Sequence, residues 1–96
     1  GCFFAAAAAE LGGRPGALRE RVAANQKDWI RLLTDAANEA VARGDLCADT
    51  DRATLVFELN ALVIAANTAY ILHDDPAVLD QARTAIRRVI AAATPT

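Results

Sequence analysis

Residues 51–72, DRATLVFELNALVIAANTAYIL, decide the fold of this chain, because fifteen of these residues are apolar and surround a helical wheel. A helix that is apolar on every side has to be buried on every side. A chain of 96 residues offers too few other elements to cover it. We therefore expect a partner to cover the rest, and a second copy of the same chain is the simplest candidate.

The composition is typical of one domain of close-packed helices. Apolar residues make up 54% of the chain, charged residues 23%, and alanine alone accounts for 24 positions. Alanine favours helices, and β-branched runs are short, so the sequence predicts an all-α fold. The net charge is −2 and the two signs are interspersed, without the basic track that binds phosphates. We therefore do not expect this chain by itself to bind nucleic acid.

The cysteines indicate in which cellular compartment the protein is expected, and the charges within the apolar stretch indicate whether that stretch could span a membrane. Cys2 and Cys47 have no paired spacing, which favours a reducing cytoplasm over a disulfide scaffold. Asp51, Arg52 and Glu58 interrupt the apolar stretch, and such charges are costly in lipid. We expect a cytoplasmic protein and no membrane partner.

Glycine, proline and aspartate divide the chain into an antiparallel bundle of four expected helices. Gly12-Gly13 favours the end of the first helix, and Gly44 the end of the second. Asp49 or Thr50 is expected to cap the third helix, with Asp51 in its first turn. Asp75 is expected to cap the fourth, with Pro76 at its first position. The expected ranges are 3–12, 15–43, 51–73 and 76–93.

The second expected helix is amphipathic, with charged residues opposite an apolar stripe. The stripe is expected to contain Leu18, Val22, Trp29, Leu32, Leu33, Ala36, Ala40 and Val41.

Four stretches in order carry a family resemblance. They are GCFFAAAAAELGGRPGALRERV, the long helix with Trp29, ARGDLCADTDRATLVFELNALVIAAN, and LHDDPAVLDQARTAIRRVI. Together they resemble the C-terminal regulatory domain of a TetR-family transcriptional repressor over nearly the whole chain. The resemblance implies a helical domain that binds a small inducer and forms a homodimer through a four-helix bundle built from the last two helices. It also implies an N-terminal helix-turn-helix domain, which is absent here, so DNA would be bound only through that domain.

The resemblance leaves two functions open. Residues 1–96 are expected to be the effector-binding and dimerisation domain of such a repressor, with an apolar or weakly polar organic inducer. The alternative is a purely structural homodimerisation module with a filled core and no ligand.

Trp29, Asn60 and Asn67 are the most distinctive candidates for an effector site between the second and third helices. The two asparagines are seven residues apart and share one helical face, where amides could orient a ligand in an apolar cavity. Equally, they could be buried amides that bond to the backbone or a partner helix, and Trp29 could be a packing residue. The expected cavity residues are Phe4, Trp29, Leu33, Phe57, Asn60, Ile64 and Asn67.

Small and apolar residues of the last two helices are the candidates for the dimer interface. Ala61, Ala65 and Ala69 follow one another at four-residue intervals and allow close approach of another helix, from the same chain or from a partner. The remaining candidates are Leu79, Ala82, Ile86, Val89 and Ile90.

Catalytic and metal-binding patterns are missing from the sequence. His73 stands beside two aspartates at the end of a helix, where it suits the helix dipole better than a metal site. No base and nucleophile can be paired. We expect neither an enzyme nor a metal or other cofactor.

Overall fold

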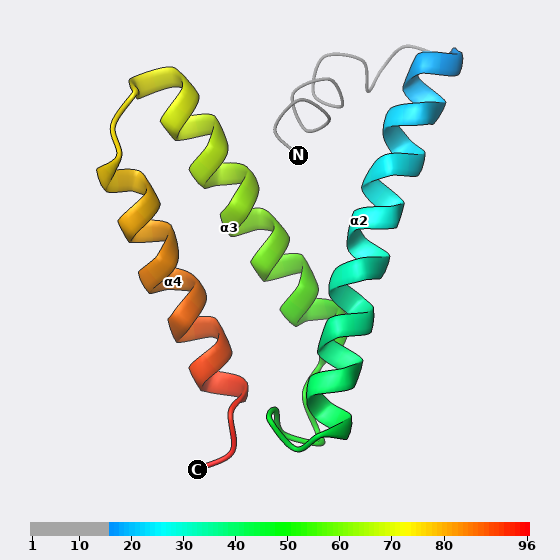
Figure 1. The fold of residues 1–96 in the computed structure, drawn as a ribbon, viewed down its shortest axis with the longest axis vertical. Helices are drawn as coiled ribbons and strands as arrows, with labels where there is room; N and C mark the ends of the chain where they lie inside the picture. The colour runs from blue at the N-terminus through cyan, green and yellow to red at the C-terminus, as the bar shows by residue number, and fades with distance from the viewer. Residues whose placement is uncertain (1–15) are drawn as a thin grey trace.

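The computed structural model describes residues 16–96, which form three α-helices (Figure 1). They are α2 (Ala17–Ala42), α3 (Arg52–His73) and α4 (Ala77–Ala93). No strand occurs among these residues, so the all-α class is confirmed. The three expected helices in this part of the chain are confirmed to within two residues at each end. The expected helix over 3–12, and with it Phe4, lies outside the described residues.

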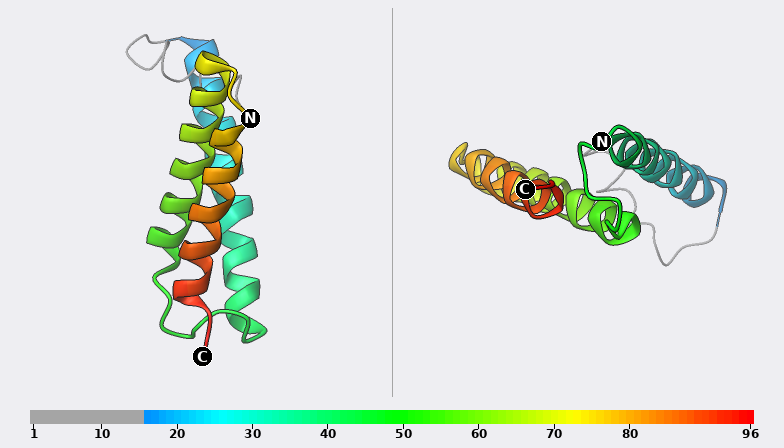
Figure 2. Two further views of the ribbon diagram at one scale, coloured as in Figure 1. Left: turned by 90° about the vertical axis from the view of Figure 1, so that its left-hand side faces the viewer. Right: turned by 90° about the horizontal axis from the view of Figure 1, so that it is seen from below.

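The central helix is α3, which contacts both of the others, whereas α2 and α4 do not contact each other. α3 and α4 run antiparallel side by side, and α2 meets α3 near the α2–α3 link and diverges from it toward the other end (Figure 1). Seen along the helices, α3 lies between α4 and α2 (Figure 2). The sequence pattern of α3 explains this place, because α3 is the most apolar of the three helices.

The buried core lies at the base, where α2, the link and α3 meet. Its members are Ala37, Leu46, Leu55 and Val56, each less than 9% exposed. Burying a valine or leucine side chain contributes about 1.5–3 kcal/mol, so this cluster fixes the angle between the two helices at one end. The N–H of Cys47 donates to the carbonyl of Ala93 at 2.7 Å, which also attaches the end of α4 to the link.

Asp51 caps α3, one or two residues later than expected. Its Oδ1 accepts from the backbone N–H of Thr54 at 3.1 Å, and its Oδ2 accepts from the Thr54 hydroxyl at 2.7 Å. The Thr50 hydroxyl instead donates to the carbonyl of Cys47 at 2.6 Å, closing the turn of the link. The expected cap at Asp49 or Thr50 is therefore wrong, because Thr50 is engaged in the turn before the helix begins.

The α3–α4 turn also differs from the expectation by one residue. Asp74 ends α3 in the left-handed conformation, with φ 50°. Pro76 occupies the cap position and α4 begins at Ala77, whose N–H donates to Oδ1 of Asp75 at 2.9 Å. The Asp75 carboxylate thus still satisfies a free N–H of the first turn, as the sequence suggested.

By length and composition alone, α3 would also suit a bilayer, and 17% of its most apolar window is buried within the chain. One such helix is weak evidence for a membrane span, because buried helices of soluble proteins have the same composition.

We expect the Asp51 cap to make stability depend on pH. The hydrogen bonds from Thr54 lower the pKa of Asp51 below its ordinary value of 3.8. A lowered folded-state pKa stabilises the fold above pH 3.8, and this stabilisation is lost as the pH falls through the folded-state pKa. Asp51→Asn keeps a capping oxygen but cannot titrate there. Its Tm should lie slightly below that of the wild type at pH 7, and the difference should close at pH 2–3, by circular dichroism.

Asp49→Asn is the control, because Asp49 is exposed and lies just before the cap. A Tm difference between wild type and Asp51→Asn that stayed constant from pH 7 to pH 2 would contradict the role of the cap.

Candidate functional site

The face of α2 that turns toward α3 carries polar side chains without charge. Its half-buried or buried positions follow each other at three- and four-residue intervals, as one side of a helix requires. These positions are Val22, Asn25, Gln26, Trp29, Ile30 and Leu33. Lys27, Asp28 and Arg31 in the same segment are all exposed. The site is therefore built from apolar and amide groups alone on this side.

A matching face of α3 is identified by Asn60. Asn67 lies seven residues further along, and Val56 and Val63 lie four before and three after it, so all four occupy one side of the helix. Val56 is buried and the other three are half-buried. Like the facing side of α2, these four positions of α3 carry no charge.

One hydrogen bond joins the two faces. The indole Nε1–H of Trp29 donates to Oδ1 of Asn60 at 2.9 Å, between residues 31 apart in the sequence. A net contribution of about 1 kcal/mol is typical of such a bond. It is the only side-chain hydrogen bond between α2 and α3 within residues 16–96, and it lies outside the core cluster at the base.

The other amides on these faces retain free hydrogen-bonding groups. No hydrogen bond joins the side chains of Asn25, Gln26 or Asn67 to another described residue, and the amide nitrogen of Asn60 likewise has none. Half-buried amides without protein partners can bond to water or to the carbonyl, hydroxyl and amide groups of a ligand. The arrangement therefore suits an uncharged molecule with an apolar body and a few polar groups.

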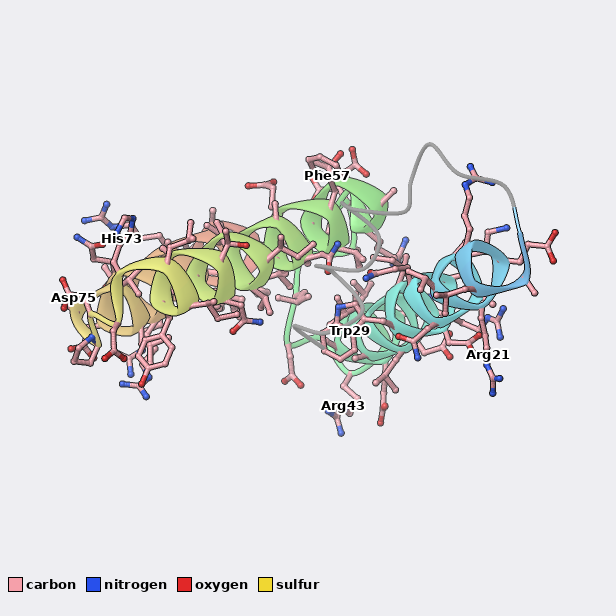
Figure 3. The ribbon with its side chains drawn as sticks, turned by 90° about the horizontal axis from the view of Figure 1, so that it is seen from above. Arg21, Trp29, Arg43, Phe57, His73 and Asp75 are labelled. Carbon is pink, nitrogen blue, oxygen red and sulfur yellow. The ribbon has the colours of Figure 1, made fainter. Side chains whose placement is uncertain are left out.

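The structure brings four of the expected cavity residues to this face, namely Trp29, Leu33, Asn60 and Asn67. Leu33 packs against the core cluster. Phe57 and Ile64 are not enclosed there: they are 72% and 36% exposed on the solvent-facing flank of α3, next to Asn60. Trp29 lies on the side of α2 near α3, whereas Phe57 points away from α2 (Figure 3).

The expected interface residues are divided between two environments. Ala61 and Ala65 are exposed on the outer face of α3, and Ile90 is 41% exposed on α4. The rest are half-buried on the inner sides of α3 and α4, the two helices that pack together within the chain; they are Ala69, Leu79, Ala82, Ile86 and Val89.

Asn25 and Gln26 lie on this face although they were not expected there, and two leucines expected on it lie elsewhere. Leu18 and Leu32 were expected on the buried stripe, but they are 58% and 61% exposed. The signal for the correct face was the three- and four-residue spacing through Val22, Asn25 and Trp29, which becomes visible only when amides are counted with apolar residues.

A groove lies at the base, away from Trp29 and Asn60. This groove has a volume of about 450 Å³ between the link, the first turns of α3 and the end of α4. Its walls include Cys47, Leu55, Val89 and Ala92, with the carboxylates of Asp49, Asp51 and Glu58. Asp51 is already engaged by Thr54, and residues 16–96 contain no group of three metal-binding side chains.

A family model described as tetracyclin repressor-like, C-terminal domain, matches residues 1–86. The chain belongs to this TetR C-terminal domain family. The membership confirms the resemblance drawn from the sequence, and the all-α fold agrees with it. The family is a regulatory one and is not known for enzymes. No match was found among curated proteins.

We expect Asn60 and Asn67 to respond differently to the same substitution. Asn60→Leu removes the acceptor for the Trp29 indole and should lower the free energy of unfolding by about 1 kcal/mol. Asn67→Leu is the matched control on the same face, and because its amide has no partner among residues 16–96 we expect a neutral or stabilising effect. Urea denaturation measures both.

A double-mutant cycle with Trp29→Phe isolates the bond, since phenylalanine removes the N–H together with some volume. A coupling energy of about 1 kcal/mol between the two sites is expected. Additive effects of Trp29→Phe and Asn60→Leu would show that the bond contributes nothing.

Proposed function

We propose that this chain is the effector-binding and homodimerisation domain of a TetR-family transcriptional repressor. A small-molecule inducer binds between α2 and α3, and the change is relayed to a DNA-binding helix-turn-helix domain of the same regulator. Membership of the TetR C-terminal domain family supports this role. DNA is contacted only through that other domain, because the described helices carry no basic track.

The observation that carries the effector site is the Trp29–Asn60 hydrogen bond within a face free of charge. An indole and an amide that meet across two helices offer a ligand one donor and one acceptor. A ligand that inserts there breaks the Trp29–Asn60 hydrogen bond and forms one hydrogen bond with each of the two side chains. This chemistry favours an uncharged, apolar or weakly polar organic effector.

Induction requires that the effector bind two helix arrangements with different affinities. The divergence of α2 from α3 beyond the core cluster provides a place where the two arrangements can differ (Figure 1). The difference then reaches the DNA-binding domain of the regulator as a change in its distance from the DNA-binding domain of the partner subunit.

A structural homodimerisation module remains the second candidate, and one observation favours it. Trp29 and Asn60 satisfy each other without any ligand, as packing residues do. The two candidates differ in whether Trp29 responds to small molecules.

Fluorescence of Trp29, the sole tryptophan, tests the effector site directly. Titration with 2-naphthol, benzamide and cyclohexanone should quench or shift its emission with saturation, because an inserted ligand replaces the Asn60 acceptor. Asn60→Leu should weaken the binding about tenfold, the equivalent of one lost hydrogen bond. Leu32→Ala, on the exposed side of α2, should bind as the wild type does. A response that is absent or linear for a broad set of uncharged compounds would favour the structural module.

Sedimentation at micromolar concentration tests homodimerisation. We expect a dimer, and we expect Ala65→Glu to convert it to a folded monomer, because a carboxylate buried without a partner costs several kcal/mol and enters a symmetric interface twice. Ala65 is exposed within the chain, so the fold itself should tolerate the change. Leu32→Glu is the control. Ile86→Asp is less informative, since Ile86 is half-buried on the side of α4 that packs against α3. A wild-type monomer would contradict the proposal.

A further inference from the structure

The outer face of α3 carries a seven-residue repeat. Six exposed positions follow each other at alternating intervals of three and four residues, the spacing at which one helix packs lengthwise against another. They are Thr54, Phe57, Ala61, Ile64, Thr68 and Ile71. None is charged, although every one of them is exposed. We call these six residues the outer seam.

Size alternates strictly along the outer seam. The first position of each repeat is small (Thr54, Ala61, Thr68), and the next is large (Phe57, Ile64, Ile71). The large residues are among the most exposed apolar side chains of the described chain: Phe57 is 72% and Ile71 63% exposed. Solvent exposure of such a surface is unfavourable, and its regular spacing suits another helix.

We infer that the outer seam packs against the outer seam of a second copy of this chain, with the two α3 helices antiparallel. The inference rests on the proposed homodimerisation and specifies its orientation and register. The two-fold axis lies between residues 62 and 63. Two residues of the different copies therefore lie at the same level when their numbers add up to 125. Phe57 then faces Thr68 of the partner subunit, Ala61 faces Ile64 of the partner subunit, and Thr54 faces Ile71 of the partner subunit.

Size complementarity selects the antiparallel orientation. Every layer then contains one large and one small residue, so all layers have similar volume and the helices can keep an even separation. A parallel pair would place Phe57 against Phe57 of the partner subunit and Ala61 against Ala61 of the partner subunit. Such layers alternate between overfilled and empty, and both conditions destabilise packing.

Charge selects the same orientation. Glu58 borders the outer seam and is its nearest charged neighbour within α3. In the antiparallel register the two copies of Glu58 are nine residues apart along the helices, which is about 13 Å. In a parallel pair they would lie at the same level, where the two like charges are closer.

The surface approaches the size of a standard interface between two proteins. α3 spans 22 residues, or about 33 Å at 1.5 Å per residue. With α4 beside it, the two-helix surface is about 20 Å wide, which gives roughly 660 Å² before side-chain corrugation is counted. A standard interface buries about 800 Å² per partner, so the flat area of one face of the α3–α4 pair is of the same order.

Disulfide cross-linking tests the orientation. In the 96-residue chain with Cys2 and Cys47 replaced by serine, Phe57→Cys and Thr68→Cys chains are prepared separately, mixed and mildly oxidised. Mass spectrometry should show the mixed disulfide, because these positions share a layer. Neither variant alone should cross-link, since two copies of residue 57 lie about 16 Å apart, beyond disulfide reach. Leu32→Cys, on the exposed side of α2, is the control.

A size swap tests the register without cysteine. Ala61→Ile and Ile64→Ala should each weaken dimerisation at least tenfold, measured by sedimentation equilibrium, and the double variant should return to within about threefold of the wild type. The restoration follows because the two positions share a layer, as double-mutant cycles detect.

The possible outcomes separate this inference from the proposed function. A wild-type dimer in which Phe57→Cys cross-links to itself would overturn the antiparallel orientation. A wild-type dimer with no cross-link in the mixture and additive effects of the swap would show that the interface lies elsewhere, while homodimerisation stands. A wild-type monomer would overturn both.

Discussion

The apolar surface of α3 is the constraint on which the rest of the structure depends. Its inner side is covered by α4 and by the base of α2, with Leu55, Val56 and Ala66 buried. Its outer side keeps Phe57 and Ile71 mostly exposed. The three described helices do not cover the outer side, because α2 and α4 contact other positions of α3 and leave it exposed. The domain is therefore built around a helix that intramolecular packing alone leaves half covered.

The core at the base and the Trp29–Asn60 bond hold α2 in different ways. Apolar burial at Ala37 and Leu46 is non-directional, and only an apolar group as large as a side chain could replace these contacts. The hydrogen bond is directional and can be exchanged with a ligand that supplies its own donor and acceptor at similar net free energy. A small effector therefore competes more easily with the bond than with the core.

The sequence predicted the helix ends that a single strong residue marks. It did not predict the position of a cap or a contact face where several neighbouring residues were equally suitable. Gly44 and Pro76 mark helix ends unambiguously, and the helices agree with them. Three successive capping residues, from Asp49 to Asp51, cannot be ranked without the turn that engages Thr50. In α3 an apolar pattern on all sides does not indicate which side meets α2. Phe57 and Ile64 were therefore expected in the cavity although they are exposed to solvent, whereas Asn60 and Trp29 are joined by a hydrogen bond.

In the proposed dimer, the layers of the outer seam also determine which helix can move. A slip of one turn between the two α3 helices would place Phe57 level with Leu72 of the partner subunit, large against large, so the pair resists sliding. α4 is held to the link by the Cys47–Ala93 hydrogen bond as well as by its packing on α3. Beyond the base, the side-chain hydrogen bonding of α2 to α3 within residues 16–96 consists of the Trp29–Asn60 bond. A ligand that replaces this bond therefore acts on α2, and α2 is the element through which effector binding changes the position of whatever precedes it in the regulator.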